Sequence, residues 1–244
     1  MRLSHQTRRI ALAIGLGIGL ANAGAAASLS VNPIGFHLTP QRPSAVLQVR
    51  NAGADPVRVQ VGAVDWSTDG RQEVLTDTDA VLLNPPIFAL QPGQTQYVRF
   101  GLRHPANSAA EASYRLLVEE VPSGAAPASG LRTLLRVSIP VFIAPAKGRE
   151  MVSWTLQQAA TGPVLAARNE GNVHAKIQQI RLANSDSNGS LQITSTAYVL
   201  PGQHKEWRLE SGKIQPGKVR LQIQTDKGEI EENLTLGADQ VPGR

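Results

Sequence analysis

The sequence predicts an all-β protein with two immunoglobulin-like β-sandwich domains, arranged like a boomerang, behind a cleaved signal peptide. Three observations predict this fold. Short segments alternate apolar and polar residues, clusters of Gly, Pro, Asn and Asp separate these segments, and no segment shows a helical repeat that ends in caps. The 244 residues exceed the ~150 of a typical domain, so the chain can bury a sizeable core.

Residues 1–27 have the three parts of a secretory signal peptide. Three arginines lie within the first nine residues, an apolar run follows at 10–20, and small residues come next. Cleavage after Ala23 or after Ala27 satisfies the small-x-small rule, so we expect a mature protein in the periplasm. A retained N-terminal anchor is the alternative, but the run is shorter than the ~20 residues that span a membrane. We therefore expect no stable membrane insertion.

Charge and composition exclude several classes of protein. The full chain has a net charge of +5, but residues 1–27 hold three of its 24 basic residues and none of its 19 acidic ones, which leaves +2 after cleavage. Such a weak basic field, with 4% aromatic residues, argues against a nucleic-acid partner. The absence of cysteine excludes disulfides, Cys-based zinc sites and thiol catalysis. A bacterial periplasm is compatible with a core that needs no disulfide.

The first domain is expected over residues 28–145. Its clearest strand is 57–64, in which valines at alternate positions share one face and Arg58 and Gln60 the other. Pro92–Gly93 predicts a turn into a further strand. The predicted strands of this domain are 45–50, 57–64, 96–102, 113–120 and 131–143.

The second domain is expected over residues 146–244, after the Pro- and Gly-containing boundary at 144–148. Turn signals such as Asn188–Gly189 separate its strands. No internal sequence repeat between the two halves is obvious. The predicted strands of the second domain are 152–157, 164–169, 175–183, 191–200, 204–209, 218–225 and 229–236.

No catalytic constellation is recognisable in the sequence. Nucleophile elbows, Walker loops and S-x-x-K motifs are absent. Glu119 and Glu120 are adjacent on a predicted strand and point to opposite faces, so they cannot share a proton. Four histidines of the mature chain are interpreted as solvated surface residues, and no metal site is expected. These histidines are His37, His104, His174 and His204.

Four motifs follow one another in the first domain. The segment 51–56 reads N-x-x-x-x-P, and 85–99 reads P-P-x-x-x-L-x-P-G-x-x-Q-x-V-R. Glu-Val-Pro stands at 120–122, and the long strand ends in F-x-x-P at 142–145. In this order, behind a signal peptide and before a second β-domain, they resemble the periplasmic PapD-like chaperones of the chaperone–usher pathway. Trp66, together with the motifs at 114–115 and 138–142, is similar to the archaic branch associated with spore-coat-protein-U-type pili.

The resemblance implies a function without catalysis and without a cofactor. Such chaperones bind, fold and cap pilus subunits by donor-strand complementation and deliver them to an outer-membrane usher. The donor strand here would be about 131–143, preceded by a Gly-, Ala-, Ser- and Pro-rich loop that fits flexibility. The alternating face expected to enter the subunit groove consists of Leu131, Thr133, Leu135, Val137 and Ile139. An internal sandwich strand with both faces covered is the alternative interpretation.

One departure from the family pattern concerns the subunit's C-terminal carboxylate. The family's gripping Arg and Lys correspond by offset to Gly35 and Pro140, which have no basic side chain. Arg115 is therefore the first candidate for the carboxylate anchor, followed by Arg99 and Arg103. Arginine suits the role because its planar fork binds a carboxylate in a bidentate manner. Alternatively, Arg115 merely pairs with a carboxylate such as Glu119 across the strand.

Two other functions compete with the chaperone interpretation. A secreted β-sandwich hydrolase would need a cluster of acid, base or metal-ligating residues, and none is apparent. A secreted pilus subunit or adhesive β-sandwich protein would carry its donor segment near the N-terminus and would lack a second domain. Here the long alternating strand is internal, and a whole β-domain follows it.

Overall fold

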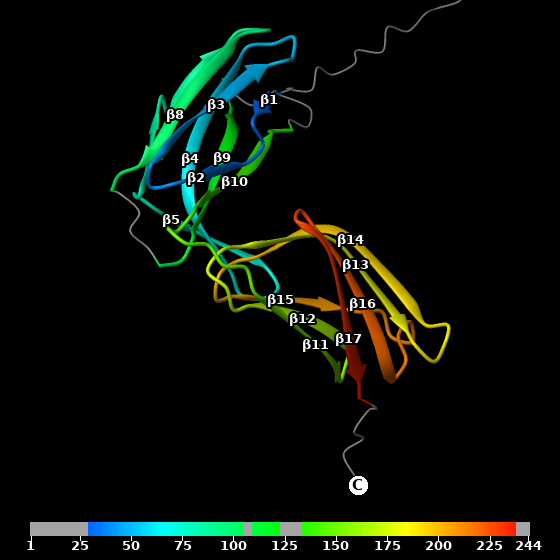
Figure 1. The fold of residues 1–244 in the computed structure, drawn as a ribbon. Coiled ribbons are helices and arrows are strands. Elements are labelled where there is room, and N and C mark those ends of the chain that lie inside the picture. Colours follow the sequence, from blue (N-terminus) through cyan, green and yellow to red (C-terminus); the bar gives the residue numbers. More distant parts are fainter. Residues whose placement is uncertain (1–28, 105–108, 123–132, 238–244) are drawn as a thin grey trace, which may run out of the picture.

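The computed structural model describes residues 29–104, 109–122 and 133–237, and in these residues it contains strands and no helix. Figure 1 shows two β-sandwich domains that meet at one end and diverge like the arms of a boomerang. The predicted all-β architecture of two sandwiches is confirmed.

The first domain packs two sheets face to face. One sheet has the strand order β1-β3-β8-β6, and the other has the order β2-β10-β9-β4-β5, with β7 also paired to β4. The strands of this domain are β1 (Leu29–Asn32), β2 (Phe36–Leu38), β3 (Ser44–Asn51), β4 (Val57–Thr68), β5 (Glu73–Asp77), β6 (Val81–Asn84), β7 (Ile87–Leu90), β8 (Thr95–Leu102), β9 (Ala112–Val121) and β10 (Arg136–Ile143).

Alternation along the strands builds the core of the first domain. On β4 the valines at 57, 59 and 61 are buried, whereas Arg58 and Gln60 are exposed, as the period of two predicts. These valines pack against Val98 and Phe100 of β8 in the facing sheet. Burying large apolar side chains in this way contributes about 1.5–3 kcal/mol each.

The N-terminal segment changes sheets between its two short strands. β1 pairs antiparallel with β3 in one sheet, and β2 pairs parallel with β10 in the other. Pro33 and Gly35 lie in the short connection, where the chain crosses from one sheet to the other. As a result, β2 lies beside the C-terminal part of β10.

The second domain is a smaller sandwich with its own core. Its sheets have the orders β11-β12-β15 and β14-β13-β16-β17. Leu165, Ile180 and Leu221 are among the buried side chains between them. Its strands are β11 (Val152–Ala159), β12 (Gly162–Asn169), β13 (Ala175–Asn184), β14 (Ser190–Val199), β15 (His204–Arg208), β16 (Gly217–Thr225) and β17 (Gly228–Leu236).

A buried asparagine holds the same turn in both domains. The Asn51 amide donates to the carbonyls of Asp55 and Leu90, and its oxygen accepts from the Gly53 amide. Asn169 repeats this pattern with Val173, Val199 and Gly171. In each domain the asparagine's backbone carbonyl also accepts from the glycine of a Pro-Gly-Gln turn, Gly93 or Gly202. The two halves therefore share an N-x-G … P-G-Q repeat that the sequence analysis missed.

Replacing either asparagine by alanine is expected to lower the free energy of unfolding by about 2–4 kcal/mol. Asn51 and Asn169 are fully buried, and each loses three hydrogen bonds, one of them to a buried carbonyl, that of Leu90 or Val199. Urea unfolding followed by circular dichroism measures the change. The control is Asn188→Ala at an exposed turn, expected within about 0.5 kcal/mol of wild type. Equal stabilities for all variants would contradict the role assigned to the buried amides.

The two domains touch through a small apolar cluster and several hydrogen bonds. Trp66 and Phe142 of the first domain pack against Leu200, with Tyr198 beside them. Gly70 accepts from the backbone amide of Glu206, and its positive φ and the ring of His204 leave no room for a Cβ.

Candidate functional site

The N-terminal part of β10 has an unpaired edge. Along its whole length β10 pairs antiparallel with β9, from Arg136–Glu119 to Ile143–Ala112. On its other side β2 pairs with residues 141–143, and within the described residues no strand pairs with 136–140 on that side. Backbone groups of this stretch are therefore open to another extended chain.

The side chains of β10 divide between two faces. Ile139 is 1% exposed in the domain's own core, and Val137 packs partly buried against that core. Leu135 is half-buried and Thr133 exposed, and both precede the strand, although the Leu135 carbonyl still accepts from the Glu120 amide. Leu131 lies outside the described residues.

The burial of Ile139 changes the expected donor set. This side chain is already enclosed between the two sheets, so a partner could reach it only if the sandwich opened. The alternating face therefore has two parts. The C-terminal part of β10 packs in the core of the first domain, and only the residues before it are available to a partner. Thr133 and Leu135 precede the strand and stay candidates for contact with a partner, as does Leu131, which is not among the described residues.

Gly35, Pro140 and Arg115 lie next to one another at the end of the unpaired edge. A Cβ on Gly35 would be 3.7 Å from the Pro140 Cγ, and Pro140 is the register partner of Arg115 on β9. The two positions that lack the family's basic residues are thus in contact, and the first candidate anchor is one strand away. Adjacent strands are ~4.8 Å apart, which is within reach of an arginine side chain.

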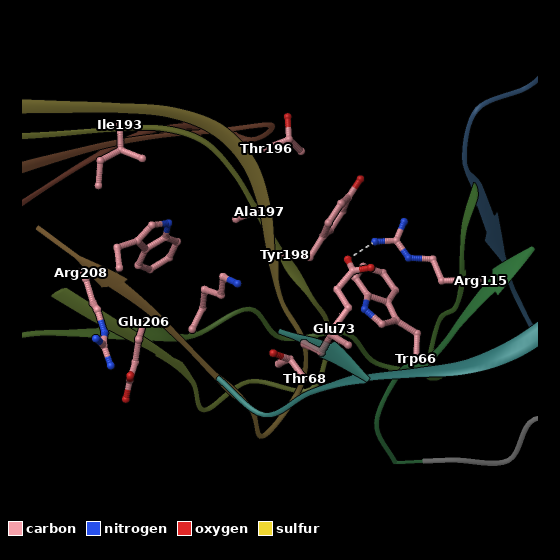
Figure 2. Close-up of a pocket in the computed structure, with 13 residues that line it drawn as sticks. Trp66, Thr68, Glu73, Arg115, Ile193, Thr196, Ala197, Tyr198, Glu206 and Arg208 are labelled. Atoms are coloured by element: carbon pink, nitrogen blue, oxygen red, sulfur yellow. Dashed lines mark hydrogen bonds and ion pairs between the residues drawn. The ribbon is translucent and has the colours of Figure 1, made fainter. Parts of the chain in front are cut away.

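Arg115 is a buried cation in a pocket between the domains. Its side chain is 10% exposed, its Nη2 pairs with Glu73, and its Cζ lies 3.6 Å from the centre of the Trp66 ring. Figure 2 shows the guanidinium directed at the Glu73 carboxylate, with Trp66 and Tyr198 nearby. The pocket has a volume of about 500 Å³ and is lined by both domains, from Trp66 to Arg208. The alternative, that Arg115 pairs with a carboxylate such as Glu119, holds with a different partner: the carboxylate is that of Glu73, and Glu119 pairs with Arg136.

Arg99 and Arg103 lie apart from this pocket. Arg99 is exposed on β8, in the sheet that does not contain β10. Arg103 follows β8 and donates from Nε to the Asp79 carbonyl. The structure therefore brings only the first of the three candidate anchors close to the unpaired edge of β10.

A second contact between the domains centres on Glu111 and His174. The Glu111 carboxylate accepts from the backbone amide of His174 at 3.0 Å and lies 2.7 Å from its Nδ1. The His174 ring stacks on Phe142, with ring centres 3.6 Å apart, and on His37. The interpretation of His174 as a solvated residue is wrong, because it is 8% exposed. The sequence feature that could have predicted its burial is its position directly before the strand 175–184, whose first residue is buried.

The His37 ring is expected to make stability sensitive to acid. Partial burial, and then the charge of His174, lower the pKa of His37 below its usual 6.5, although Glu111 and Asp226 oppose this and Lys176 adds to it. Protonation therefore favours the unfolded chain, and stability decreases as the pH falls below about 6.5.

His37→Gln is expected to reduce this pH dependence slightly. The free energy of unfolding measured at pH 7.5 and pH 5 gives the slope, and exposed His104→Gln is the control. An unchanged slope in His37→Gln would contradict the assignment.

The described residues contain neither a cluster of metal-ligating side chains nor a membrane-spanning helix. Within residues 29–104, 109–122 and 133–237, no three His, Asp or Glu side chains are grouped so that they could hold a metal ion. The same part of the chain contains no helix that is both long and apolar enough to cross a membrane.

Several solved structures with the same fold are chaperones. A chain from the CsuC–CsuE chaperone–tip adhesion subunit pre-assembly complex, from archaic Csu pili of Acinetobacter baumannii, is 18% identical. The match has a TM-score of 0.67 and covers 87% of this chain and all of that one. A chain from the SafA pilin–SafB chaperone complex of Salmonella enterica (18% identity, TM-score 0.60) matches over 86% of this chain and 96% of that chain. The E. coli chaperone DraB is 19% identical, with a TM-score of 0.58, and the match covers 86% of this chain and 98% of DraB.

The sequence itself also matches a family model. No curated protein matches. Residues 28–149 match the model of the N-terminal domain of PapD, described as a pili and flagellar-assembly chaperone. This match spans half of the chain and contains the unpaired edge of β10 and Arg115 itself. The chain therefore belongs to the PapD family of pili and flagellar-assembly chaperones.

Proposed function

We propose that this protein binds pilus subunits in the periplasm by donating the unpaired edge of β10 and the residues before it. The observation that carries the proposal is the edge at 136–140, which pairs with β9 on one side and with no described strand on the other. An incomplete subunit sandwich gains main-chain hydrogen bonds from such an edge. Leu131, Thr133 and Leu135 supply side chains for its groove, and Val137 lies at the boundary.

The position of β2 indicates where a strand of the bound subunit, here called the guest strand, would end. β2 runs parallel to β10 and begins opposite Val141, so it occupies the line that a guest strand on the same edge would follow. A guest strand parallel to β10 must therefore end near Pro140. Its C-terminal carboxylate would then lie beside the pocket between the domains.

Arg115 is the proposed anchor for this carboxylate. Arg115 lies on β9, directly across from Pro140. It is therefore a basic residue next to one of the two positions at which the family has its basic pair. A fixed charge contact at this point would set the register of the guest strand, which main-chain pairing alone specifies weakly. Arg99 lies on the other sheet and Arg103 directly after it, and neither is proposed.

The proposed role is non-enzymatic and requires no cofactor. Apolar burial and strand pairing supply the binding energy, at ~25 cal/mol per Å² of apolar surface. The bound subunit is then delivered to an outer-membrane usher, as the chaperone–usher system requires. Solved structures of two similar chaperones contain a bound partner, the tip adhesion subunit CsuE and the pilin SafA.

Co-expression with the pilus subunit encoded in the same gene cluster tests the proposal. We expect a soluble one-to-one complex in the periplasmic fraction and degradation of the subunit when the chaperone is absent. Size-exclusion chromatography with mass determination gives the stoichiometry. A subunit that is equally soluble and protease-resistant without the chaperone would overturn the proposal.

A further inference from the structure

We infer that the pocket around Arg115 and Trp66 is a carboxylate-binding site that Glu73 fills in the free protein and a partner's carboxylate takes over. The inference rests on the proposed function and extends it with an internal substitute for the guest. It assigns a role to β5, the exposed strand at the edge of the sheet that carries Glu73.

Glu73 satisfies only part of the buried cation. The Glu73 carboxylate pairs with Nη2 of Arg115, while the Arg115 Nε and the neighbouring Trp66 Nε1 are buried without a hydrogen-bond partner in the described structure. Buried donors without acceptors are unusual in folded proteins. A carboxylate that enters the pocket could bind the guanidinium in a bidentate manner and satisfy the Nε as well.

Glu73 also holds the guanidinium away from the donor edge. In this sheet β9 lies between β10 and β4, and β5 lies beyond β4. The Arg115 side chain lies over Trp66 of β4 and pairs with Glu73 of β5, so it is turned away from Pro140 of β10. Releasing the Glu73 pair frees the guanidinium for the carboxylate of a guest strand that ends beside the pocket.

The two partners of this ion pair differ in burial, which makes exchange feasible. The Arg115 side chain is 10% exposed, whereas that of Glu73 is 49% exposed on a strand whose residues are all exposed. An ion pair with a hydrated carboxylate is weak and easily replaced. Without any partner, however, the free protein would hold a buried charge uncompensated. Glu73 thus balances the charge of Arg115 in the free protein, and a carboxylate of the bound subunit can still replace it.

Glu73→Gln removes the internal competitor and leaves the side chain nearly the same size. The probes are two synthetic peptides that copy the last strand of the co-purified subunit, one with a free C-terminal carboxylate and one amidated. We expect Glu73→Gln to bind the carboxylate peptide about two- to fivefold more tightly than wild type, and the amidated peptide equally. The matched control is Asp77→Asn, which removes the same charge from the same face of β5 and should bind both peptides like wild type.

A second measurement needs no substitution at Glu73. In wild type, the carboxylate peptide is expected to shift the NMR resonances of the Trp66 indole N–H and the Arg115 Nε–H, and the amidated peptide is not. Trp66→Phe assigns the indole signal. This reading stands even if Glu73→Gln fails to fold.

The outcomes separate this inference from the proposed function. If wild type binds both peptides with equal affinity and neither resonance shifts, the carboxylate site is wrong while strand donation stands. Equal affinity of Glu73→Gln and wild type for the carboxylate peptide would overturn the exchange. If wild type binds neither the subunit nor either peptide, the proposed function fails and the inference fails with it.

Discussion

Changing Leu131 and Leu135 together to Asp is expected to abolish the complex with the pilus subunit while the chaperone stays folded. Each leucine that enters the subunit groove contributes about 1.5–3 kcal/mol, and an ionised carboxylate there adds a desolvation penalty. The combined loss exceeds about 4 kcal/mol, or about a thousandfold in affinity. Leu135 is half-buried and outside the apolar core of the first domain, so the fold should tolerate the change.

Leu134→Asp is the matched control, because Leu134 is 41% exposed and lies next to Leu135 on the opposite face. Co-purification of the subunit and its protection from proteolysis are the measurements, with circular dichroism to check folding. A normal yield of complex with both leucines changed would show that the wrong strand or the wrong face has been assigned. Loss of the complex in Leu134→Asp alone would reverse the assignment of the two faces.

Strands with a buried alternating face could be predicted from the sequence. The segments at 57–64, 96–102 and 113–120 each correspond to a strand in the structure, because their apolar positions repeat every two residues. All seven strands expected after residue 150 are also present. Turn residues such as Pro92–Gly93 marked the strand ends correctly.

Short edge strands could not be predicted in the same way. β1, β2, β5, β6 and β7 have three to five residues each, and β5 is exposed along its whole length. A strand with no buried face has no alternation to detect, and its existence depends on pairing with a distant segment. Glu73, which lies on β5, was therefore missed as the partner of Arg115.

The division of β10 into two parts also depends on tertiary structure. The sequence shows one continuous alternation from 131 to 139, but the point at which β2 and the facing sheet cover the strand is a property of the fold. For this reason Ile139 was grouped with Leu135, although it serves the domain's own core. By contrast, motif spacing along the chain was enough to single out Gly35 and Pro140, and the structure adds that these two positions lie beside each other.

Arg115→Ala is expected to lower the affinity for the subunit by more than tenfold with little loss of folding stability. Truncating one partner of a buried charge-assisted pair costs about 2–5 kcal/mol of binding, much of it from the carboxylate left without a cation. The fold loses less, because the Glu73 carboxylate is half-exposed and can be hydrated once Arg115 is gone. Arg115→Lys should recover part of the affinity, since an ammonium keeps the charge and loses the bidentate fork.

Arg99→Ala and Arg103→Ala are the matched controls, since each removes one positive charge from the same domain at an exposed position outside the pocket. Both are expected to bind the subunit like wild type at physiological salt, where charges beyond ~8 Å are screened. Binding is measured by isothermal titration with the subunit, and folding by urea denaturation.

If Arg115→Ala folds and binds like wild type, the anchor assignment is wrong. If Arg99→Ala or Arg103→Ala instead lowers affinity tenfold, the carboxylate is held at the other sheet, and the guest strand cannot end at Pro140. If all three bind like wild type, apolar pockets set the register, and a charge anchor has no place in this chaperone.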